Sequence, residues 1–288
     1  TGGCRVHGKG PMNYRHVYHA GNFADVLKHV VLIALIEALK TKQTPFAVLD
    51  THAGAGRYSL ASEEALKTGE FRDGVMRLLA AERLPTLVHA YLNLVRPQNG
   101  VQHYPGSPLI AAQLLRDSDR LILCEVQDTE VESLRQLFAR DGRVAVHQRD
   151  GYQAMAALLP PAEKRGLVLI DSPFEAQEQE FRIIEGALAA AHKRFANGVY
   201  AVWYPIKLRQ SVLPFHRWLK ESGMRKVLVA EICVHPDNSA LRLNGCGMAI
   251  INAPYKLDRT LAEMLPTLAT TLAQSRYAQF KLEWLVED

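Results

Sequence analysis

The sequence is poor in cysteine and has no long apolar run. Its four cysteines, Cys4, Cys124, Cys233 and Cys246, include no Cys-x-x-Cys pair, so their spacing indicates neither a zinc site nor a disulfide framework, and we expect a reducing, cytoplasmic setting. The longest apolar run, in VVLIALIEALK, is interrupted by Glu37. Since it is far shorter than the roughly 20 residues that cross a bilayer, we predict no membrane span and no membrane partner.

The chain of 288 residues, 48% of them hydrophobic, is long enough to bury a substantial core. Residues 1–11, TGGCRVHGKGP, are small and polar and lack the apolar segment of a signal peptide, so we interpret them as a leader or a vector-derived remnant before Met12. The net charge of +4 is too small to identify a polyanionic partner. Basic residues are concentrated between His192 and Lys226 and interleaved with aromatic residues, which favours a nucleic-acid surface there; an ordinary solvated face is the alternative.

Seven short β-rich runs alternate with segments of helical period. Alternating strands and helices are typical of a parallel sheet covered on both faces, so we predict an α/β fold with a mostly parallel seven-stranded sheet. The last two runs have no long helix between them and are expected to form an antiparallel hairpin at one edge. The runs are residues 46–50, 120–126, 143–148, 166–171, 198–205, 225–234 and 247–254.

The connection between the first and second runs is much longer than a compact βαβ unit of roughly 30 residues requires. We therefore interpret residues 57–105 as an inserted helical subdomain, and residues 12–56 and 106–288 as the main domain. The insertion is followed by SPLIAAQLLR, in which we expect Ser107 to cap a helix that begins at Pro108.

A glycine-containing loop follows the first run, in AVLDTHAGAGRY. Gly54 and Gly56 let a ligand approach the backbone closely. A dinucleotide-binding fingerprint has a third glycine where this sequence has Ser59, which argues against NAD. On the glycines alone, a plain strand-to-helix turn stays an alternative.

Carboxylates end the next two runs. Glu125 ends the second run, where an acidic side chain accepts hydrogen bonds from ribose hydroxyls. Asp150, followed by Gly151, ends the third and is placed to accept a hydrogen bond from the exocyclic amine of an adenine. Either residue alone could be an ordinary surface carboxylate. Together they follow consecutive strands at the edge where such sheets bind ligands.

The fourth run ends at Asp171, the first residue of the tetrapeptide Asp171-Ser172-Pro173-Phe174. This tetrapeptide is similar to the [Asp/Asn/Ser]-Pro-Pro-[Tyr/Phe] loop of amino-group methyltransferases. In that chemistry Asp171 and the carbonyl of Ser172 accept hydrogen bonds from the two N–H groups of an exocyclic amine, which moves the nitrogen toward tetrahedral geometry. Phe174 stacks on the extruded base. The methyl donor carries its own positive sulfur, so no metal is required. A structural turn after a buried strand is the alternative.

A second stretch, Asn252-Ala253-Pro254-Tyr255, has a related pattern. It follows the last run, beyond the switch point of the sheet where a cofactor binds, so we do not expect it to be catalytic.

The N-terminal stretch NYRHVYHAGNFADVLKHVV combines aromatic and basic residues. His16 and His19 could suggest a metal site, but no cysteine or carboxylate stands at ligand spacing from them, so a metal site is not predicted. We expect a helix from about residue 23 that carries Lys28 and His29 toward a cofactor, preceded by an arm in which Tyr14 and His16 contact RNA.

The segments YRHVYHAGNFADVLKH, LDTHAGAGRY, YPGSP, CEV, RDGY, LIDSPF and WYPI together resemble the RlmJ family of adenine-N6 methyltransferases of bacterial 23S ribosomal RNA. The resemblance extends from Met12 to the end of the chain. It implies a Rossmann-like methyltransferase fold, S-adenosylmethionine as the methyl donor, no metal, and a monomer that acts on RNA in the cytoplasm.

The resemblance also implies roles for individual residues. Asp171 is the catalytic residue with Phe174 beside it, and Tyr14 contacts the substrate RNA. One departure is Ser172, which stands where the family usually has proline and puts the rigidity of the loop in question. The implied cofactor contacts are Lys28, His29, His52, Ser107, Glu125, Asp150, Gly151 and Asp171.

Other functions stay open at this point. Members of this family have been linked to the use of external DNA, so a DNA-handling protein or a DNA adenine methyltransferase is the main alternative. The sequence offers no clustered carboxylates for a two-metal nuclease. A catalytically inactive RNA-binding module is disfavoured by the intact Asp171, and an NAD-dependent oxidoreductase by the missing third glycine.

Overall fold

The computed structural model describes residues 16–96, 103–240 and 242–287. The predictions for the leader, residues 1–11, and for Tyr14 fall outside these ranges. No helix in the described part of the chain is both long and apolar enough to cross a membrane.

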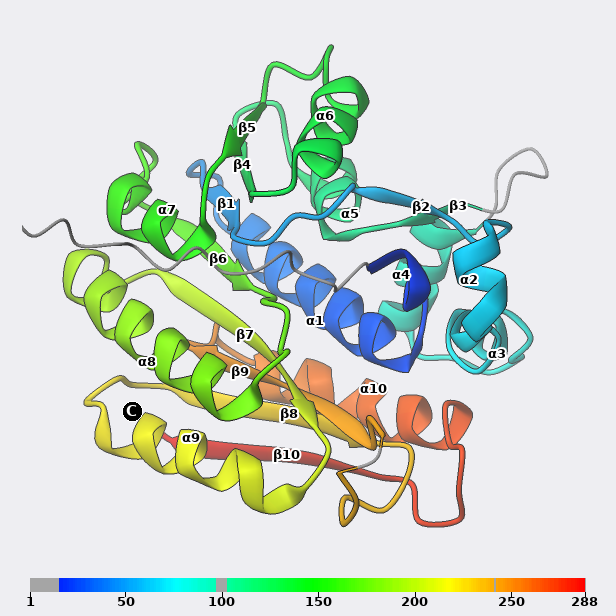
Figure 1. Cartoon of the computed structure of the whole chain (residues 1–288). Coiled ribbons are helices and arrows are strands. Elements are labelled where there is room, and N and C mark those ends of the chain that lie inside the picture. Colours follow the sequence, from blue (N-terminus) through cyan, green and yellow to red (C-terminus); the bar gives the residue numbers. More distant parts are fainter. Residues whose placement is uncertain (1–15, 97–102, 241, 288) are drawn as a thin grey trace, which may run out of the picture.

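A single large sheet of eight strands, in the order β10–β8–β9–β7–β6–β1–β4–β5, forms the centre of the molecule (Figure 1). β1 pairs in parallel with both β4 and β6, and β5 and β7 extend the parallel part on either side. β9 is antiparallel to β7 and β8, and β10 is antiparallel to β8. In chain order the strands are β1 (Ala47–Asp50), β4 (Arg120–Glu125), β5 (Val144–Gln148), β6 (Gly166–Ile170), β7 (Val199–Ile206), β8 (Val227–Cys233), β9 (Gly245–Ile251) and β10 (Gln279–Val286).

The predicted α/β fold with a mostly parallel sheet is confirmed, but the predicted number of seven strands is wrong. The eighth strand, β10, alternates apolar Phe280 and Leu282 with charged Lys281 and Glu283, and it is partly exposed at the edge of the sheet. β8 and β9 form the expected antiparallel hairpin. Because β10 pairs with β8, this hairpin does not itself form the edge.

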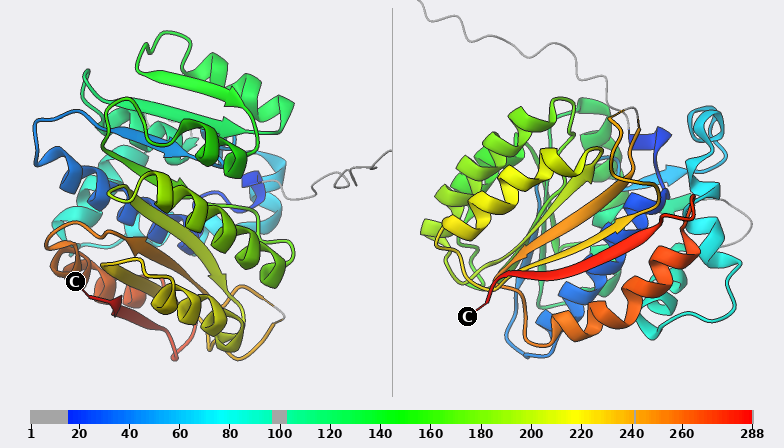
Figure 2. Two further views of the ribbon diagram at one scale, coloured as in Figure 1. Left: turned by 90° about the vertical axis from the view of Figure 1, so that its left-hand side faces the viewer. Right: turned by 90° about the horizontal axis from the view of Figure 1, so that it is seen from below.

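Helices cover both faces of the sheet (Figures 1 and 2). Successive side chains of a strand point to opposite faces of the sheet and pack in two separate hydrophobic cores. In β6, Leu167 and Leu169 pack on the face that α1 covers, and Val168 and Ile170 pack on the face that α8 covers. On the first face lie α1 (Phe23–Lys40), α5 (Ser107–Leu114), α6 (Asp128–Leu137) and α10 (Leu257–Thr271). On the second lie α7 (Gly151–Leu158), α8 (Gln177–Arg194) and α9 (Arg209–Glu221).

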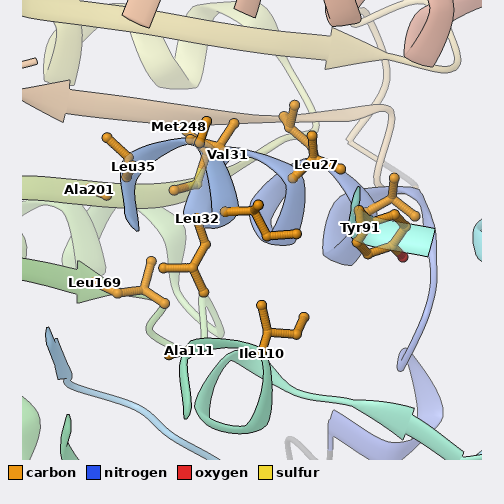
Figure 3. Packing of buried hydrophobic residues seen from close by; sticks show 14 of the residues in the cluster. Leu27, Val31, Leu32, Leu35, Tyr91, Ile110, Ala111, Leu169, Ala201 and Met248 are labelled. Carbon is orange, nitrogen blue, oxygen red and sulfur yellow. The ribbon is translucent and has the colours of Figure 1, made fainter. Parts of the chain in front are cut away.

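Helix α1 is the central element of the first face. Its start is fixed by Asn22, whose side chain accepts hydrogen bonds from the N–H groups of Ala24 and Asp25. Most of its residues are buried, including charged residues in its first two turns. Figure 3 shows side chains of α1 packed between the sheet and α5, with Leu27, Val31, Leu32 and Leu35 opposite Leu169, Ala201, Met248, Ile110 and Ala111.

The segment predicted as an insertion, residues 57–105, lies beside α1 and closes at its base in a two-stranded ladder of β2 (Arg57–Ser59) and β3 (His103–Pro105). Its buried residues, such as Val88 and Tyr91 of α4, belong to the same core as α1. The division into a subdomain and a main domain stays a prediction, and the core is continuous across that boundary. The segment also contains α2 (Glu63–Thr68), the 3-10 helix η2 (Glu70–Arg72), α3 (Val75–Leu79) and α4 (Thr86–Val95).

Candidate active site

The parallel strands β1, β4, β5 and β6 bring their carboxyl ends to one edge of the sheet. Asp50 ends β1, Glu125 ends β4, Asp150 follows β5 and Asp171 follows β6. Four carboxylates from positions far apart in the sequence therefore lie along one edge, where open α/β sheets bind their ligands. We call this edge the carboxyl edge.

Asp171 is held by a buried chain of charges that starts in α1. Its Oδ2 lies 2.5 Å from the Nζ of Lys28, which is also 2.7 Å from Oδ1 of Asp25. The other oxygen of Asp25 is 3.0 Å from Nε2 of His16 and accepts the N–H of Gly21 at 2.9 Å. His16 lies in the 3-10 helix η1 (His16–Tyr18), so the arm before α1 is joined to the loop after β6.

The protonation of this chain follows from its neighbours. Burial opposes charge on Lys28, but the carboxylates of Asp171 and Asp25 raise the pKa of Lys28 well above its ordinary value. Burial likewise opposes charge on Asp25, yet His16 and Lys28 hold the pKa of that carboxyl well below its ordinary value. Lys28 is therefore a cation and Asp25 an anion at neutral pH.

Glu125 organises the loop after β1 rather than projecting freely. One oxygen accepts the N–H of Gly54 at 2.9 Å, and the other accepts the N–H groups of Val126 and Gln127 at 2.7 and 2.9 Å. Gly54 has a φ of 59°, a conformation that favours glycine. A side chain at Gly54 would also meet the hydroxyl of Tyr58, which accepts the N–H of Ala55 at 3.1 Å.

Ser107 reaches the site differently from the sequence prediction. The residue that caps α5 is Gly106, and Ser107 is the first helical residue, so the prediction of Ser107 as the cap is wrong. Its hydroxyl instead donates to Oδ2 of Asp50 at 2.6 Å. Burial raises the pKa of Asp50 to about 6, against the effect of this hydrogen bond. A hydroxyl that bonds a buried carboxylate is not available as a cap.

Asp150 and Gly151 form the start of α7. Oδ1 of Asp150 accepts the N–H groups of Tyr152 and Gln153 at 3.0 Å each, which is the pattern of a helix cap. A Cβ on Gly151 would lie 2.1 Å from the carbonyl oxygen of Thr51. Glycine is needed here because α7 approaches the end of β1 so closely.

The two histidines of the predicted cofactor site are neutral. Burial lowers the pKa of His29 to about 3, and burial also lowers the pKa of His52. Nδ1 of His29 is 2.8 Å from the hydroxyl of Tyr104. The ring of His52 packs edge-on against Tyr152, with ring centres 5.2 Å apart.

Phe174 lies in the loop between β6 and α8 and is partly buried. Its ring makes edge contacts with Phe181 of α8 and Trp203 of β7, at 5.3 and 5.8 Å between ring centres. Ser172, beside the catalytic candidate Asp171, is buried. The loop is thus fixed by aromatic packing in addition to the single proline, Pro173.

The second Asn-x-Pro-Tyr stretch lies at the opposite edge of the sheet. β9 runs antiparallel to β7, and Ile251 pairs with Tyr200 near the start of β7, so Asn252 follows at the amino edge. Its side chain donates to the carbonyls of Ala196 and Gly198 at 2.8 and 2.7 Å, and its φ is 55°. Asn252 has a structural role as a bridge between turns.

The basic stretch from His192 to Lys226 places charged residues at both edges of the sheet. Lys193 and Arg194 end α8, and Arg225 and Lys226 precede β8, which places all four at the amino edge. Arg209 is at the carboxyl edge, where it pairs with Glu231 and Asp237. The aromatic residues interleaved with the basic ones are largely buried, Phe195 and Tyr204 among them. The interpretation of this stretch as a nucleic-acid surface stays a prediction, and its charges are divided between two edges of the sheet.

Two residues of the site were missed by sequence reasoning. Asp25 stands three positions before Lys28, a spacing that places both on one face of a helix; this was an available signal. Trp203 follows the last residue of β7 that pairs with β6, which could not be known without the register. Within the ranges that the structure describes, no three His, Cys, Asp or Glu side chains are grouped to hold a metal.

Comparisons with known proteins agree on one family. A family model described as "Ribosomal RNA large subunit methyltransferase D, RlmJ" matches residues 43–286. The chain is 42% identical over 280 residues to Ribosomal RNA large subunit methyltransferase J of Escherichia coli strain K12, and 41% identical over 281 residues to the protein of that name from Haemophilus influenzae. Each match covers 96% of this chain and 100% of the relative.

A solved structure agrees over almost the whole fold. The crystal structure of protein LPL1258 from Legionella pneumophila is 36% identical and superposes with a TM-score of 0.84, covering 92% of this chain and 98% of that one.

Proposed function

Because this chain belongs to the RlmJ family of ribosomal RNA large subunit methyltransferases, we propose that it methylates the N6 amine of an adenine in 23S ribosomal RNA, with S-adenosylmethionine as the donor. The observation that carries this proposal is the position of Asp171. It is an acceptor at the carboxyl edge, held by a buried cation, in a loop that ends in an aromatic ring.

The residues at the carboxyl edge suit S-adenosylmethionine. Glu125 and Asp150 offer carboxylate oxygens for hydroxyl and amine groups, and glycines at 54 and 151 let the backbone come close. Nε2 of His29 is buried without a partner among the described residues, so it is a polar atom that a ligand can satisfy. We propose that Lys28, His29, His52, Ser107, Glu125, Asp150, Gly151 and Asp171 form the cofactor site.

The chemical task of Asp171 is to make an unreactive amine nucleophilic. The lone pair of an adenine N6 is delocalised into the ring. Two acceptors that take hydrogen bonds from both N–H groups of N6 draw this nitrogen toward tetrahedral geometry. Asp171 accepts one N–H and the carbonyl of Ser172 accepts the other. Since Lys28 binds Oδ2, the second oxygen of Asp171 is the one that faces the amine. The same carboxylate is placed to take the proton that the nitrogen loses. When bound, S-adenosylmethionine supplies an electrophilic methyl group on a positively charged sulfur.

The target base has to leave its stack to reach Asp171. Phe174 gives it a face to stack on, and Trp203 supports Phe174 from β7. The serine in the usual proline position keeps the carbonyl acceptor.

We further propose that His16 and Tyr14 contact RNA from the arm before α1, that the enzyme is a monomer and that it acts in the cytoplasm.

The test is mass spectrometry of nucleosides from ribosomal RNA, from cells with and without the gene. We expect one N6-methyladenosine in large-subunit RNA to disappear with the gene and to return with the purified protein. An unchanged RNA together with a loss of methyladenine from DNA would favour the alternative, a DNA adenine methyltransferase.

A further inference from the structure

Three buried side chains, Tyr91, Tyr104 and His29, form a chain of hydrogen bonds, here called the relay, between the segment 57–105 and the proposed cofactor site. Tyr104 is the middle residue of β3, and its hydroxyl is 2.8 Å from Nδ1 of His29 in α1. The same hydroxyl is 3.1 Å from the hydroxyl of Tyr91 in α4. All three residues are at most 1% exposed. Figure 3 shows Tyr91 near the end of α1 that carries Leu27, the neighbour of Lys28.

The relay stops at an atom with no partner. Nε2 of His29 is buried and makes no hydrogen bond to any described residue. Leaving a buried polar atom unpaired is unfavourable, and such atoms in native proteins call for an explanation. His29 is neutral, since burial and the nearby Lys28 lower its pKa. One ring nitrogen therefore carries hydrogen and the other is an acceptor.

Counting hydrogen atoms decides the direction of the relay. If Tyr91 donates to Tyr104 and Tyr104 donates to Nδ1, both hydroxyl hydrogens are used and only the Nε2–H is left over. If the direction is reversed, two groups are left over, the hydroxyl hydrogen of Tyr91 and the lone pair of Nε2. Burial raises the pKa of Tyr104 well above its ordinary value, so its hydroxyl keeps its hydrogen in either case. The first direction leaves fewer unpaired groups and is favoured.

We propose that Tyr91 and Tyr104 are positioning residues that hold His29 in its Nε2–H form, so that this N–H donates to an acceptor atom of the bound cofactor. The proposal rests on the proposed function. Both tyrosines belong to the segment 57–105, which gives that segment a role in cofactor binding as well as in packing. Because Nε2 is closed to solvent, the acceptor reaches it with a local movement of the side chains that cover it.

The first test reads the tautomer directly by nitrogen-15 NMR of histidine-labelled protein. In the parent protein we expect His29 to show a hydrogen-bearing Nε2 and a bare Nδ1. In the Tyr104→Phe variant, Nδ1 loses its donor and the two forms should mix. A merely structural role of Tyr104 would leave the tautomer unchanged. A bare Nε2 in the parent protein would overturn the proposal.

The second test measures binding of S-adenosylhomocysteine by calorimetry. Loss of one well-placed hydrogen bond corresponds to about a tenfold change in Kd, so we expect Tyr104→Phe to bind about tenfold more weakly and Tyr91→Phe to show a smaller loss. The matched control is Tyr200→Phe, whose buried hydroxyl donates to the carbonyl of Phe195 near the amino edge; its Kd should not change.

The outcomes separate this inference from the proposed function. Equal binding by the parent protein and Tyr104→Phe would overturn the inference alone. A parent protein that binds no S-adenosylhomocysteine would overturn the proposed function and the inference with it. If Tyr104→Phe is not folded by thermal unfolding, Tyr91→Phe, which keeps Tyr104 in place, carries both tests.

Discussion

Lys28 and Asp171 form an ion pair with 2.5 Å between Nζ and Oδ2, although 143 positions separate them in the sequence. Their side chains are 5% and 16% exposed, so the pair is largely shielded from water. It ties the first turns of α1 to the loop after β6. The orientation of the catalytic candidate thus depends on a helix that comes before the first strand.

Replacing Lys28 by Met should therefore affect both stability and rate. Asp25 and Asp171 both lose the cation that lies between them, and breaking a buried pair on one side costs about 3–5 kcal/mol. The methylation rate should fall at least roughly 100-fold, by analogy with losing one preorganised transition-state contact. Urea unfolding and single-turnover rates measure the two effects.

The double variant Asp25→Asn with Lys28→Met separates these effects. It removes the more deeply buried of the two carboxylates left without Lys28, so part of the stability should return while the rate stays low. Lys40→Met is the control at the other end of α1, where an exposed pair with Glu37 contributes at most about 1 kcal/mol. A double variant with the parent rate would show that Lys28 has no part in positioning Asp171.

Replacing Phe174 by Ala should weaken the use of RNA and not of the cofactor. One base–aromatic stack contributes roughly 1–3 kcal/mol, so kcat/KM for RNA should fall about tenfold or more. The Kd for S-adenosylhomocysteine should stay nearly constant. If both fall equally, the ring supports the cofactor site instead of the base.

Replacing Gly151 by Ala should be destabilising, because the new Cβ would meet the backbone of Thr51 at 2.1 Å. Overpacking of this kind costs roughly 1–3 kcal/mol, and it should also weaken cofactor binding by moving the start of α7. Gly186→Ala is the control. It lies inside α8 with nothing within 4 Å of a new Cβ, and it should stabilise the protein by up to about 1 kcal/mol. A harmless Gly151→Ala would contradict the close approach of α7 to β1.

Replacing Asp50 by Asn should change how stability depends on pH. Burial raises the pKa of Asp50 from 3.8 to about 6 in the folded protein. Between these two pH values the Asp50 carboxyl is protonated in the folded state and ionised in the unfolded state. This contribution is fully present below pH 4 and is lost as the pH rises through 6. The free energy of unfolding of the variant, relative to that of the parent, should rise by up to about 3 kcal/mol between pH 4 and pH 7. Parallel curves of unfolding free energy against pH would show that Asp50 is not perturbed by burial.

Much of the fold could be predicted because strands and helices are local patterns. The seven predicted runs correspond to strands of the sheet, and the ends of four of them supply the carboxylates of the site. The eighth strand, β10, was missed because its charged residues alternate with apolar ones at an exposed edge, and its partner β8 is distant in sequence. An edge strand of this kind is recognised from its pairing, which is a tertiary property.

The site was less predictable than the fold for the same reason. Ser107 was expected as a helix cap because serine before proline is the common local pattern, but a buried carboxylate at position 50 competes for its hydroxyl. The link from Tyr104 to His29 likewise needs two elements from different parts of the chain to meet. Local rules identify which residues carry chemistry, and long-range packing decides what each of them contacts.

The most direct test of the central claim compares the two candidate loops in single-turnover methylation of a 23S RNA fragment. Asp171→Ala should lower the rate at least roughly 100-fold, since it removes an acceptor that matters most as the amine becomes tetrahedral. Asn252→Gly, which keeps the left-handed backbone at the opposite edge, should keep the parent rate and lose roughly 1 kcal/mol of stability with its two hydrogen bonds. A folded Asp171→Ala variant that methylates at the parent rate would contradict the account.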